Sequence, residues 1–130
     1  MTGSSRSGAL AILLLAAFAP GGQAGVAEDL LDGYRAAGAG QFDAQAGAQL
    51  WRQDFAGRSC RSCHGDNPRR PGRHQRTGKR IAPLSPTVNP QRLQDATKVA
   101  KWLYRNCKWT LGRECSAQEK GDLISWLARL

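Results

Sequence analysis

The chain has 130 residues, a formal net charge of +9, four cysteines, two histidines and one methionine. This length suits a single domain. The excess of lysine and arginine would favour nucleic acid as a partner in a cytosolic protein. The first residues carry an export pattern, however, so an acidic partner protein or the anionic groups of a ligand are the better hypotheses.

The N-terminal segment is typical of a secretory signal peptide. After the basic Arg6, residues 9–19 form an unbroken apolar run of 11, and small residues follow at Ala24 and Ala27. A helix that spans a bilayer needs about 20 apolar residues, so a retained membrane anchor is the weaker alternative. A basic start, a short apolar region and small residues at the exit are the three parts of a signal peptide.

Export divides the chain into two parts. We expect residues 1–24 to be the signal peptide, with cleavage after Ala24 or alternatively after Ala27, and residues 25–130 to form one mature domain in the periplasm. Cleavage removes Met1, the only methionine, so the mature domain has no thioether.

The first half of the mature domain predicts two helices. Residues 28–37 carry apolar side chains on one side, and the glycine-rich residues 38–40 end this helix. Asp43 is a suitable N-cap for a second helix over residues 44–55, which has Gly47 on its inner face. This second helix leads towards the first pair of cysteines.

Residues 65–89 form a long loop that is poor in apolar side chains. Between Arg58 and Arg80 the sequence has eight Arg or Lys residues and one acidic residue, Asp66. Such a segment cannot build a core of its own. It is therefore either disordered or wrapped around something that is not protein.

The second half predicts helices over residues 90–106 and 117–129. Asn89 and the proline after it have the pattern of a cap and a first helical residue. Ser116 and Glu119 form a capping box in front of the last helix. With no strand alternation and no internal repeat, the sequence predicts a small all-α domain.

The strongest motif of the chain is Cys60-Arg-Ser-Cys63-His64. This is the attachment motif of a c-type haem, in which two thiols join the haem vinyl groups. The adjacent histidine lies on the same turn and faces the iron as the proximal ligand. We therefore expect one covalently attached haem c, held by Cys60 and Cys63, with His64 bound to iron.

Other interpretations of the cysteines fit less well. A redox Cys-x-x-Cys motif would require a βαβ surrounding that the pattern does not show. A zinc site with Cys107 and Cys115 has the wrong spacing, since seven residues separate that pair. A disulfide between Cys60 and Cys63 would close a strained loop.

The sixth iron ligand is not the usual one. Class I cytochromes c use methionine, and the mature domain has none. The remaining candidates are His74, an amide such as that of Asn106, a lysine, a tyrosine, water, or no ligand. His74 would give a conventional low-spin electron carrier.

The order of elements resembles class I cytochromes c along the whole mature domain. A helix leads into the Cys-x-x-Cys-His motif, a long loop follows, and a C-terminal helix closes the fold. In that family the helix before the motif crosses the last helix closely. The resemblance implies that Gly47 lies at this crossing, near Trp51 and Trp126 or Leu127.

Several stretches are similar to the SHP group (sphaeroides haem protein) of high-spin cytochromes c, from about Leu30 onward. They are Arg76-Thr-Gly-Lys79, Ile81-Ala-Pro-Leu84, Lys101-Trp-Leu-Tyr-Arg-Asn-Cys107, Gly112-Arg-Glu-Cys115 and Glu119-Lys-Gly-Asp-Leu123. This chain departs from the family chiefly in residues 68–75, which are more basic and include His74.

The resemblance implies a specific iron ligand and a disulfide. Asn106 stands where that family has an asparagine whose side-chain oxygen binds ferric iron, and Cys107–Cys115 matches its disulfide. A neutral, hard amide oxygen should hold ferric iron better than ferrous iron and dissociate on reduction. The position it leaves would be open to O₂, NO or CO, so we expect an electron-accepting protein that binds a diatomic ligand, with reduction of that ligand left open.

Further site residues follow from the resemblance. Pro83 matches a loop proline whose carbonyl accepts a hydrogen bond from the proximal histidine in class I cytochromes c. The candidate partners of the haem propionates are Arg76, Thr77, Lys79 and Trp102. The remaining basic residues would steer an acidic redox partner, which in the SHP group is a dihaem cytochrome c. A disulfide-stapled basic binding module without haem is a third hypothesis.

Overall fold

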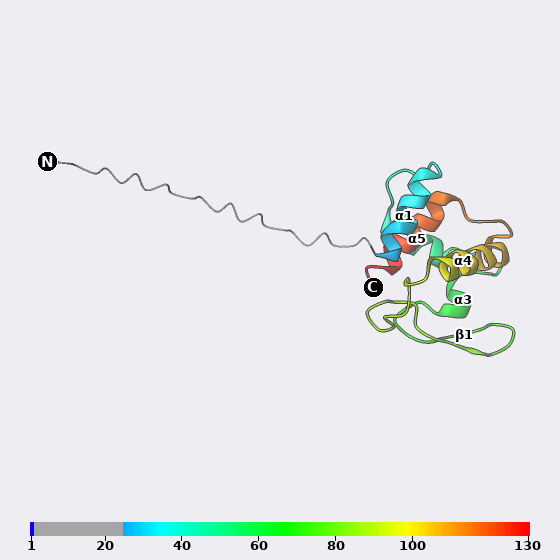
Figure 1. The fold of residues 1–130 in the computed structure, drawn as a ribbon. Coiled ribbons are helices and arrows are strands. Elements are labelled where there is room, and N and C mark those ends of the chain that lie inside the picture. Colours follow the sequence, from blue (N-terminus) through cyan, green and yellow to red (C-terminus); the bar gives the residue numbers. More distant parts are fainter. Residues whose placement is uncertain (2–24) are drawn as a thin grey trace.

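The protein is described by a computed structural model that covers Met1 and residues 25–130. The expected signal peptide, Met1 aside, lies outside the described residues. Helices dominate the described part of the chain, together with one short hairpin (Figure 1). The elements are α1 (Val26–Ala36), α2 (Ala44–Arg52), α3 (Arg61–His64), β1 (Gly72–Arg73), β2 (Arg80–Ile81), α4 (Ala96–Leu111) and α5 (Ala117–Leu127).

The expected N-cap of α2 is confirmed. The Oδ1 atom of Asp43 accepts a hydrogen bond from the backbone N–H of Gln45 at 2.7 Å, which satisfies one of the free donors of the first turn. The helix ends at Arg52 rather than near residue 55. A tight turn follows instead, because the Asp54 carboxylate accepts a hydrogen bond from the Gly57 N–H at 2.8 Å.

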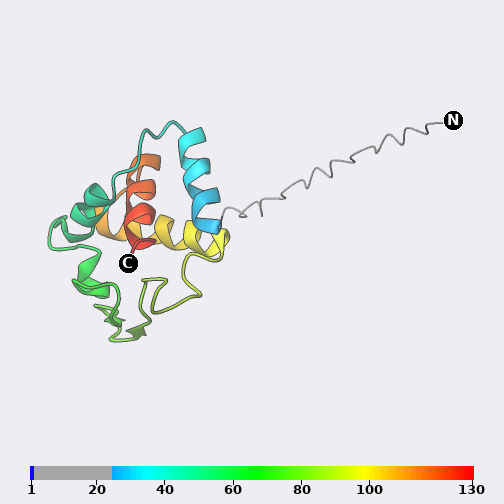
Figure 2. The same cartoon turned by 90° about the vertical axis from the view of Figure 1, so that its left-hand side faces the viewer.

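A close crossing of α2 and α5 organises the core. A Cβ atom at Gly47 would lie only 2.2 Å from the carbonyl oxygen of Asp122, so only glycine fits there. The expected position of Gly47 is thereby confirmed. Figure 2 shows α5 between α1 and α2. The buried cluster around the crossing consists of Leu50, Trp51, Leu123 and Leu127.

The start of α4 differs from the prediction. Asp95, not Asn89, is the N-cap, since its carboxylate accepts a hydrogen bond from the Lys98 N–H at 2.9 Å. The side-chain amide of Asn89 instead donates to the carbonyl of Pro83, six residues earlier. Leu93 has a φ of 57°, a left-handed backbone angle that does not occur within a right-handed helix, so no continuous helix can include it. The helix also extends past residue 106, as far as the left-handed Gly112.

The last helix begins as predicted. Ser116 accepts from the Glu119 N–H at 3.1 Å, and the Glu119 carboxylate accepts from the Ser116 N–H at 2.8 Å. This confirms the capping box. The helix ends at Leu127, two residues before the expected end.

The loop expected over residues 65–89 is ordered by backbone hydrogen bonds and contains a hairpin. Strands β1 and β2 pair antiparallel, with Gly72 opposite Ile81. Further along, the N–H groups of Leu84 and Ser85 both donate to the Pro68 carbonyl, at 2.8 and 3.2 Å. The fully buried Ser85 hydroxyl reaches the carbonyl oxygen of Leu130. The backbone of this loop therefore has a defined conformation, held by hydrogen bonds within the loop and to Leu130.

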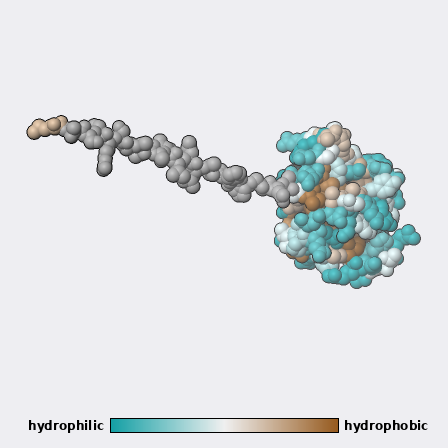
Figure 3. Space-filling model, in the orientation of Figure 1, coloured by the Kyte–Doolittle hydropathy of each residue, from teal (hydrophilic) through white to brown (hydrophobic). Residues whose placement is uncertain are grey.

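The surface seen in Figure 3 is mostly hydrophilic, with small hydrophobic patches between polar residues. Among the described helices, none has the length and apolar character required to cross a membrane. The two strands have only two residues each, so the expectation of an all-α fold is confirmed in its essentials.

Candidate functional site

The attachment motif forms one helical turn at α3. Cys60 has helical backbone angles (φ −59°, ψ −40°), and its carbonyl accepts a hydrogen bond from the His64 N–H at 3.2 Å. Cys60 and Cys63 carry free thiols, and both are half-buried. Gly65, with a φ of 77°, ends the turn directly after the histidine. Two thiols and an imidazole are therefore presented from a single turn.

Trp51 supports this turn from the core side. Its indole N–H donates to the Gly65 carbonyl at 3.0 Å, and its ring centroid lies 5.3 Å from that of His64. The same indole packs edge-on against Trp126, and the centres of the two rings are also 5.3 Å apart. Packing contacts therefore connect the core of the α2–α5 crossing to His64.

The hairpin packs directly against the motif. A Cβ atom at Gly72 would lie 2.2 Å from the Cys63 carbonyl oxygen and 2.7 Å from the Cα of His64. The backbone N–H of Gln75 lies 3.4 Å from the Cys63 sulfur as a hydrogen-bond donor. The basic loop is consequently fixed to the turn that carries Cys60, Cys63 and His64.

Burial sets the protonation of the site. It lowers the pKa of His64 to about 4, assisted by the positive charge of Arg92. At neutral pH the imidazole is therefore uncharged, which is the form that binds metal ions. Burial also raises the pKa of the Cys60 thiol to about 11, so this thiol is protonated at neutral pH.

The carbonyl of Pro83 carries two hydrogen bonds from other side chains. Asn89 donates to it through Nδ2 at 2.9 Å, and Arg92 donates through Nε at 2.8 Å. The expected hydrogen bond from His64 to this oxygen stays a prediction. These contacts of Asn89 and Arg92 were not predicted from the sequence, because nothing in their local pattern indicates a partner in the loop.

Helix α4 carries the proposed sixth ligand. Asn106 and Trp102 are four residues apart and therefore lie on the same face; Asn106 is exposed, and 50% of the Trp102 surface is accessible. The guanidinium of Arg105 lies 5.3 Å from the Trp102 ring centre. Directly after Asn106, Cys107 is bonded to Cys115, which ties α4 to the start of α5.

The other predicted residues lie in the turn of the hairpin. Arg76, Thr77 and Lys79 are all exposed there. The Thr77 N–H donates to the Nδ1 atom of His74 at 3.2 Å, and the His74 N–H donates to the Lys79 carbonyl at 2.8 Å. In the structure, His74 therefore takes part in two hydrogen bonds of the hairpin turn. Its ring uses Nδ1 for the bond with Thr77, which leaves Nε2 as the other ring nitrogen.

These residues fit a covalently bound haem. Two free thiols and a neutral imidazole on one turn are the donor set that the group requires. Nearby elements present apolar surface that an apolar macrocycle would cover, since Val88 and Trp102 are 47% and 50% exposed. The disulfide Cys107–Cys115 leaves only Cys60 and Cys63 as thiols, which argues against a four-cysteine zinc site.

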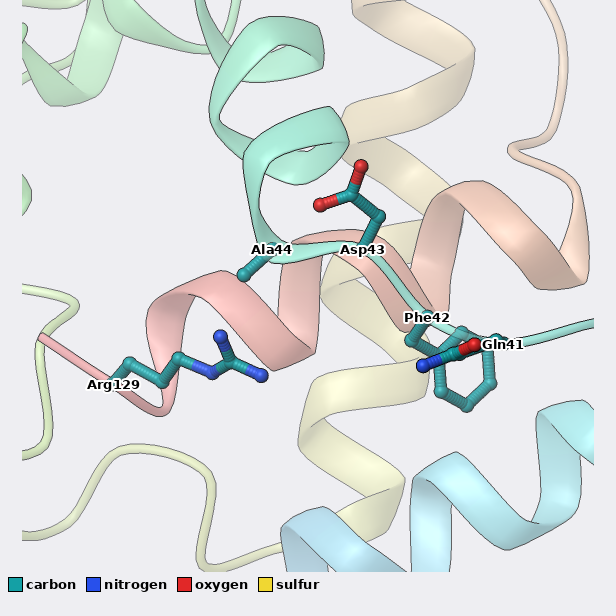
Figure 4. Close-up of a pocket in the computed structure, with 5 residues that line it drawn as sticks. All are labelled: Gln41, Phe42, Asp43, Ala44 and Arg129. Atoms are coloured by element: carbon teal, nitrogen blue, oxygen red, sulfur yellow. The ribbon is translucent and has the colours of Figure 1, made fainter.

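A separate depression lies on the side of α1, α2 and α5 (Figure 4). It has a volume of about 370 Å³ and contains none of the predicted site residues. Its lining residues are Gln41, Phe42, Asp43, Ala44 and Arg129.

Comparison with known proteins identifies relatives over most of the chain. Residues 37–127 match a family model described as a domain of unknown function, DUF1924. The cytochrome c-type protein SHP of Cereibacter sphaeroides is 44% identical over 104 residues, which cover 76% of this chain and 80% of that protein. A solved structure of oxidized SHP, described as an oxygen-binding cytochrome c, has a TM-score of 0.75 and 42% identity, and the match covers 80% of this chain and 96% of that one.

A second relative is cytochrome c'' of Methylophilus methylotrophus. It is 42% identical over 69 residues, which are 53% of this chain and 48% of that protein. Its oxidized crystal structure has a TM-score of 0.69 and 32% identity, and the match covers 79% of this chain and 93% of that one. Both relatives are cytochromes, in agreement with the donor set on α3. The chain therefore belongs to the DUF1924 family and, within it, to the SHP-type cytochromes c, with one covalently attached haem c.

Proposed function

We propose that this protein is a periplasmic cytochrome c that accepts electrons and binds a small diatomic ligand, such as O₂ or NO, at an iron position that Asn106 leaves on reduction. The observation that carries the proposal is the placement of Asn106 on α4, directly before a disulfide, in a chain without methionine after Met1. The description of SHP as an oxygen-binding cytochrome c supports it.

Two residues of the chain would have separate roles toward a bound haem. When bound, haem c supplies an iron centre that changes between the ferric and ferrous states. His64 would hold it as a neutral imidazole, because burial keeps its pKa at about 4. Asn106 offers a neutral amide oxygen, which is a hard ligand and prefers ferric iron. The disulfide next to Asn106 fixes the backbone of α4, so that only the side chain has to move.

Electrons would come from an acidic redox protein, and the family resemblance favours a dihaem cytochrome c. The hairpin and its flanks present six exposed cations, and none of them takes part in an ion pair among the described residues. Because the hairpin packs on Cys63, a partner bound there would lie close to the haem attachment turn. The six cations, called the hairpin cations below, are Arg69, Arg70, Arg73, Arg76, Lys79 and Arg80.

The absorption spectrum of the purified holoprotein, with and without dithionite, tests the proposal. We expect a high-spin ferrous form that takes up CO, because Asn106 no longer occupies the iron. A sharp low-spin ferrous spectrum that does not change with CO would contradict it. Consumption of O₂ or NO in the presence of excess reductant would then measure whether the bound ligand is also reduced.

The alternative is a conventional electron carrier with His74 as the sixth ligand. One observation favours it: His74 lies on the hairpin that packs against the haem turn, and its Nε2 atom is not used in the hydrogen bond with Thr77. Substitution of His74 by alanine separates the two functions. The ferric spectrum should change markedly only if His74 binds iron.

A further inference from the structure

The outer side of helix α4 carries a row of exposed cations that the proposed function does not use. We propose that this row, with the aromatic side chains beside it, is a contact surface for an anionic phospholipid membrane. The inference is separate from the proposed function, since neither the iron nor its ligands take part. The row, called the α4 cations below, consists of Lys98, Lys101, Arg105 and Lys108.

Helical spacing places the α4 cations on one side of the helix. Successive members are three or four residues apart, so they follow one another along the same face. The buried residues of α4, Cys107 and Thr110, lie on the opposite side. The sequence has no acidic residue between Ala96 and Leu111. The outer side of α4 is therefore positively charged over most of its length.

Few acidic groups neutralise this row. Lys98 lies 3.8 Å from the carboxylate of Asp95, and such an exposed ion pair is weak. The other three α4 cations form no ion pair among the described residues. A hydrogen bond to a tyrosine hydroxyl and, to a smaller extent, the charge of Glu114 raise the pKa of Lys108. The row therefore stays charged at neutral pH and is available to an anionic partner.

Aromatic side chains border the row on both edges. Tyr104 is 44% exposed, and the ammonium of Lys108 lies 4.5 Å from its ring centre and donates to its hydroxyl at 2.7 Å. On the other edge, Trp109 is half-buried, and the guanidinium of Arg58 lies 5.8 Å from its ring centre. Tyrosine and tryptophan are enriched where a membrane meets water, because each has an apolar ring and a polar tip.

The composition of this surface favours a lipid over a protein. Three of the four α4 cations are lysines, a residue that is depleted at protein interfaces, whereas arginine is enriched there. The hairpin cations differ, since five of the six are arginines and residues 69–80 include no Phe, Trp or Tyr. The depressions on the α1 and α5 side contain no residue of α4. A convex basic helix suits a membrane surface, which attracts cations through its negative potential and needs no pocket.

The α4 cations and the hairpin lie in different parts of the molecule. Figures 1 and 2 both show the hairpin at the lower end, with α4 above it. A membrane bound on the outer side of α4 would therefore leave the hairpin cations accessible to an electron donor. Each cation near an anionic membrane contributes about fivefold to the affinity, which corresponds to its usual free energy of attraction.

Sedimentation of the holoprotein with lipid vesicles tests the inference. One set of vesicles contains phosphatidylcholine alone, and the other contains roughly equal parts of phosphatidylcholine and the anionic phosphatidylglycerol. We expect the parent protein to bind only the mixed vesicles. Lys101→Gln/Lys108→Gln should weaken this binding by about 25-fold, whereas Arg70→Gln/Arg80→Gln, which has the same net charge, should weaken it by less than about fivefold.

Tyr104 provides a test that leaves the charge unchanged. Tyr104→Ser should weaken binding to the mixed vesicles because the ring is lost, and Tyr104→Phe should restore most of it. These side chains are exposed, so the variants should keep the thermal unfolding temperature of the parent, which is measured alongside.

Three results would overturn the inference. The parent protein does not bind the mixed vesicles, or the two double variants lose the same factor, which would mean that net charge alone drives binding. The third result is that Lys101→Gln/Lys108→Gln slows reduction by an acidic cytochrome but binds vesicles like the parent, which would make this face a protein interface. Uptake of CO by the ferrous protein tests the proposed function, so the two proposals can fail separately.

Discussion

Asn106, the proposed iron ligand, differs from a methionine in how its environment constrains it. A methionine is an apolar residue that favours burial, whereas Asn106 is exposed on α4 and has no hydrogen-bond partner among the described residues. Its neighbour Cys107 is only 4% exposed and is fixed by the disulfide. The side chain can therefore rotate while its Cα stays in place, as the proposed release of Asn106 on reduction would require.

Replacement of Asn106 by leucine should remove the ferric ligand and keep the ferrous site open. Leucine has a similar size but no donor atom, so we expect the ferric absorption and electron paramagnetic resonance spectra to change to those of a protein without this ligand. CO binding to the ferrous form should be retained. The exposed Lys108→Leu on the same helix is the control, and an unchanged ferric spectrum in Asn106→Leu would exclude this residue as the ligand.

At the level of elements, the crossing of α2 and α5 holds the haem turn in place. Trp51 belongs to α2, packs on Trp126 of α5 and donates to the backbone just after His64. A shift of one helix against the other would therefore move the indole that contacts His64. Gly47 permits the contact that sets this arrangement.

Gly47→Ala should destabilise the protein by about 1–3 kcal/mol, the usual cost of overpacking a core. The new Cβ would lie 2.2 Å from a backbone oxygen, which cannot rotate away as a side chain can. Gly33→Ala in α1 is the matched control, because a Cβ there meets nothing within 4 Å and alanine favours the helix. Urea unfolding of both variants measures the difference; equal stability would show that the crossing tolerates a methyl group.

The capping box of α5 makes stability depend on pH. Hydrogen bonds from Arg113 hold the pKa of Glu119 below its ordinary value of 4.5. The folded state therefore keeps this carboxylate charged where the unfolded chain already takes up a proton, and its contribution to stability is present above that value and lost as the pH falls through the folded pKa. Glu119→Gln should remove this part of the acid dependence.

Unfolding free energies at about pH 6 and pH 4 test this expectation. The loss of stability between the two should be smaller in Glu119→Gln than in the parent protein. Glu114→Gln replaces a nearby exposed carboxylate that forms no ion pair within the described residues, so its acid dependence should follow the parent. An unchanged slope in Glu119→Gln would contradict the role of the Arg113 bonds.

A helix start could be predicted from the sequence where its capping hydrogen bond lies within a few residues. The caps at Asp43 and Ser116 are satisfied within three residues, and the sequence indicated both. Asn89 has an equally good capping pattern, but its amide bonds to Pro83, six residues earlier. The choice between Asn89 and Asp95 depends on the folded loop, so no local pattern could have settled it.

At the scale of the whole molecule, the same difference between local and long-range contacts explains why the conformation of the basic loop, residues 65–89, was not predicted. Its composition predicted that it would be either disordered or wrapped around another group. The structure orders it through contacts that composition does not show, namely Gly72 against Cys63 and two N–H groups on Pro68. The haem motif, in contrast, needs only one turn of chain, and it was identified from spacing alone.

The arrangement of charge over the molecule leads to the last prediction. The hairpin cations have no ion-pair partners within the described residues and are attached to the haem turn, so they should attract an acidic electron donor to that side. Charges at a distance beyond about 10 Å are screened at 0.1 M salt, and steered association slows as salt increases. The rate of reduction by an acidic dihaem cytochrome c should therefore fall with ionic strength.

The double variant Arg70→Gln/Arg80→Gln removes two of these charges without touching the proposed propionate partners. We expect slower reduction at low salt and a weaker salt dependence than in the parent protein, measured by stopped-flow absorption. The double variant Arg35→Gln/Arg129→Gln has the same net charge but changes the α1 and α5 side, so it should retain most of the parent rate. Equal effects of the two double variants would mean that net charge, and not the hairpin, attracts the donor, because long-range attraction depends on total charge whereas docking depends on where the charges lie.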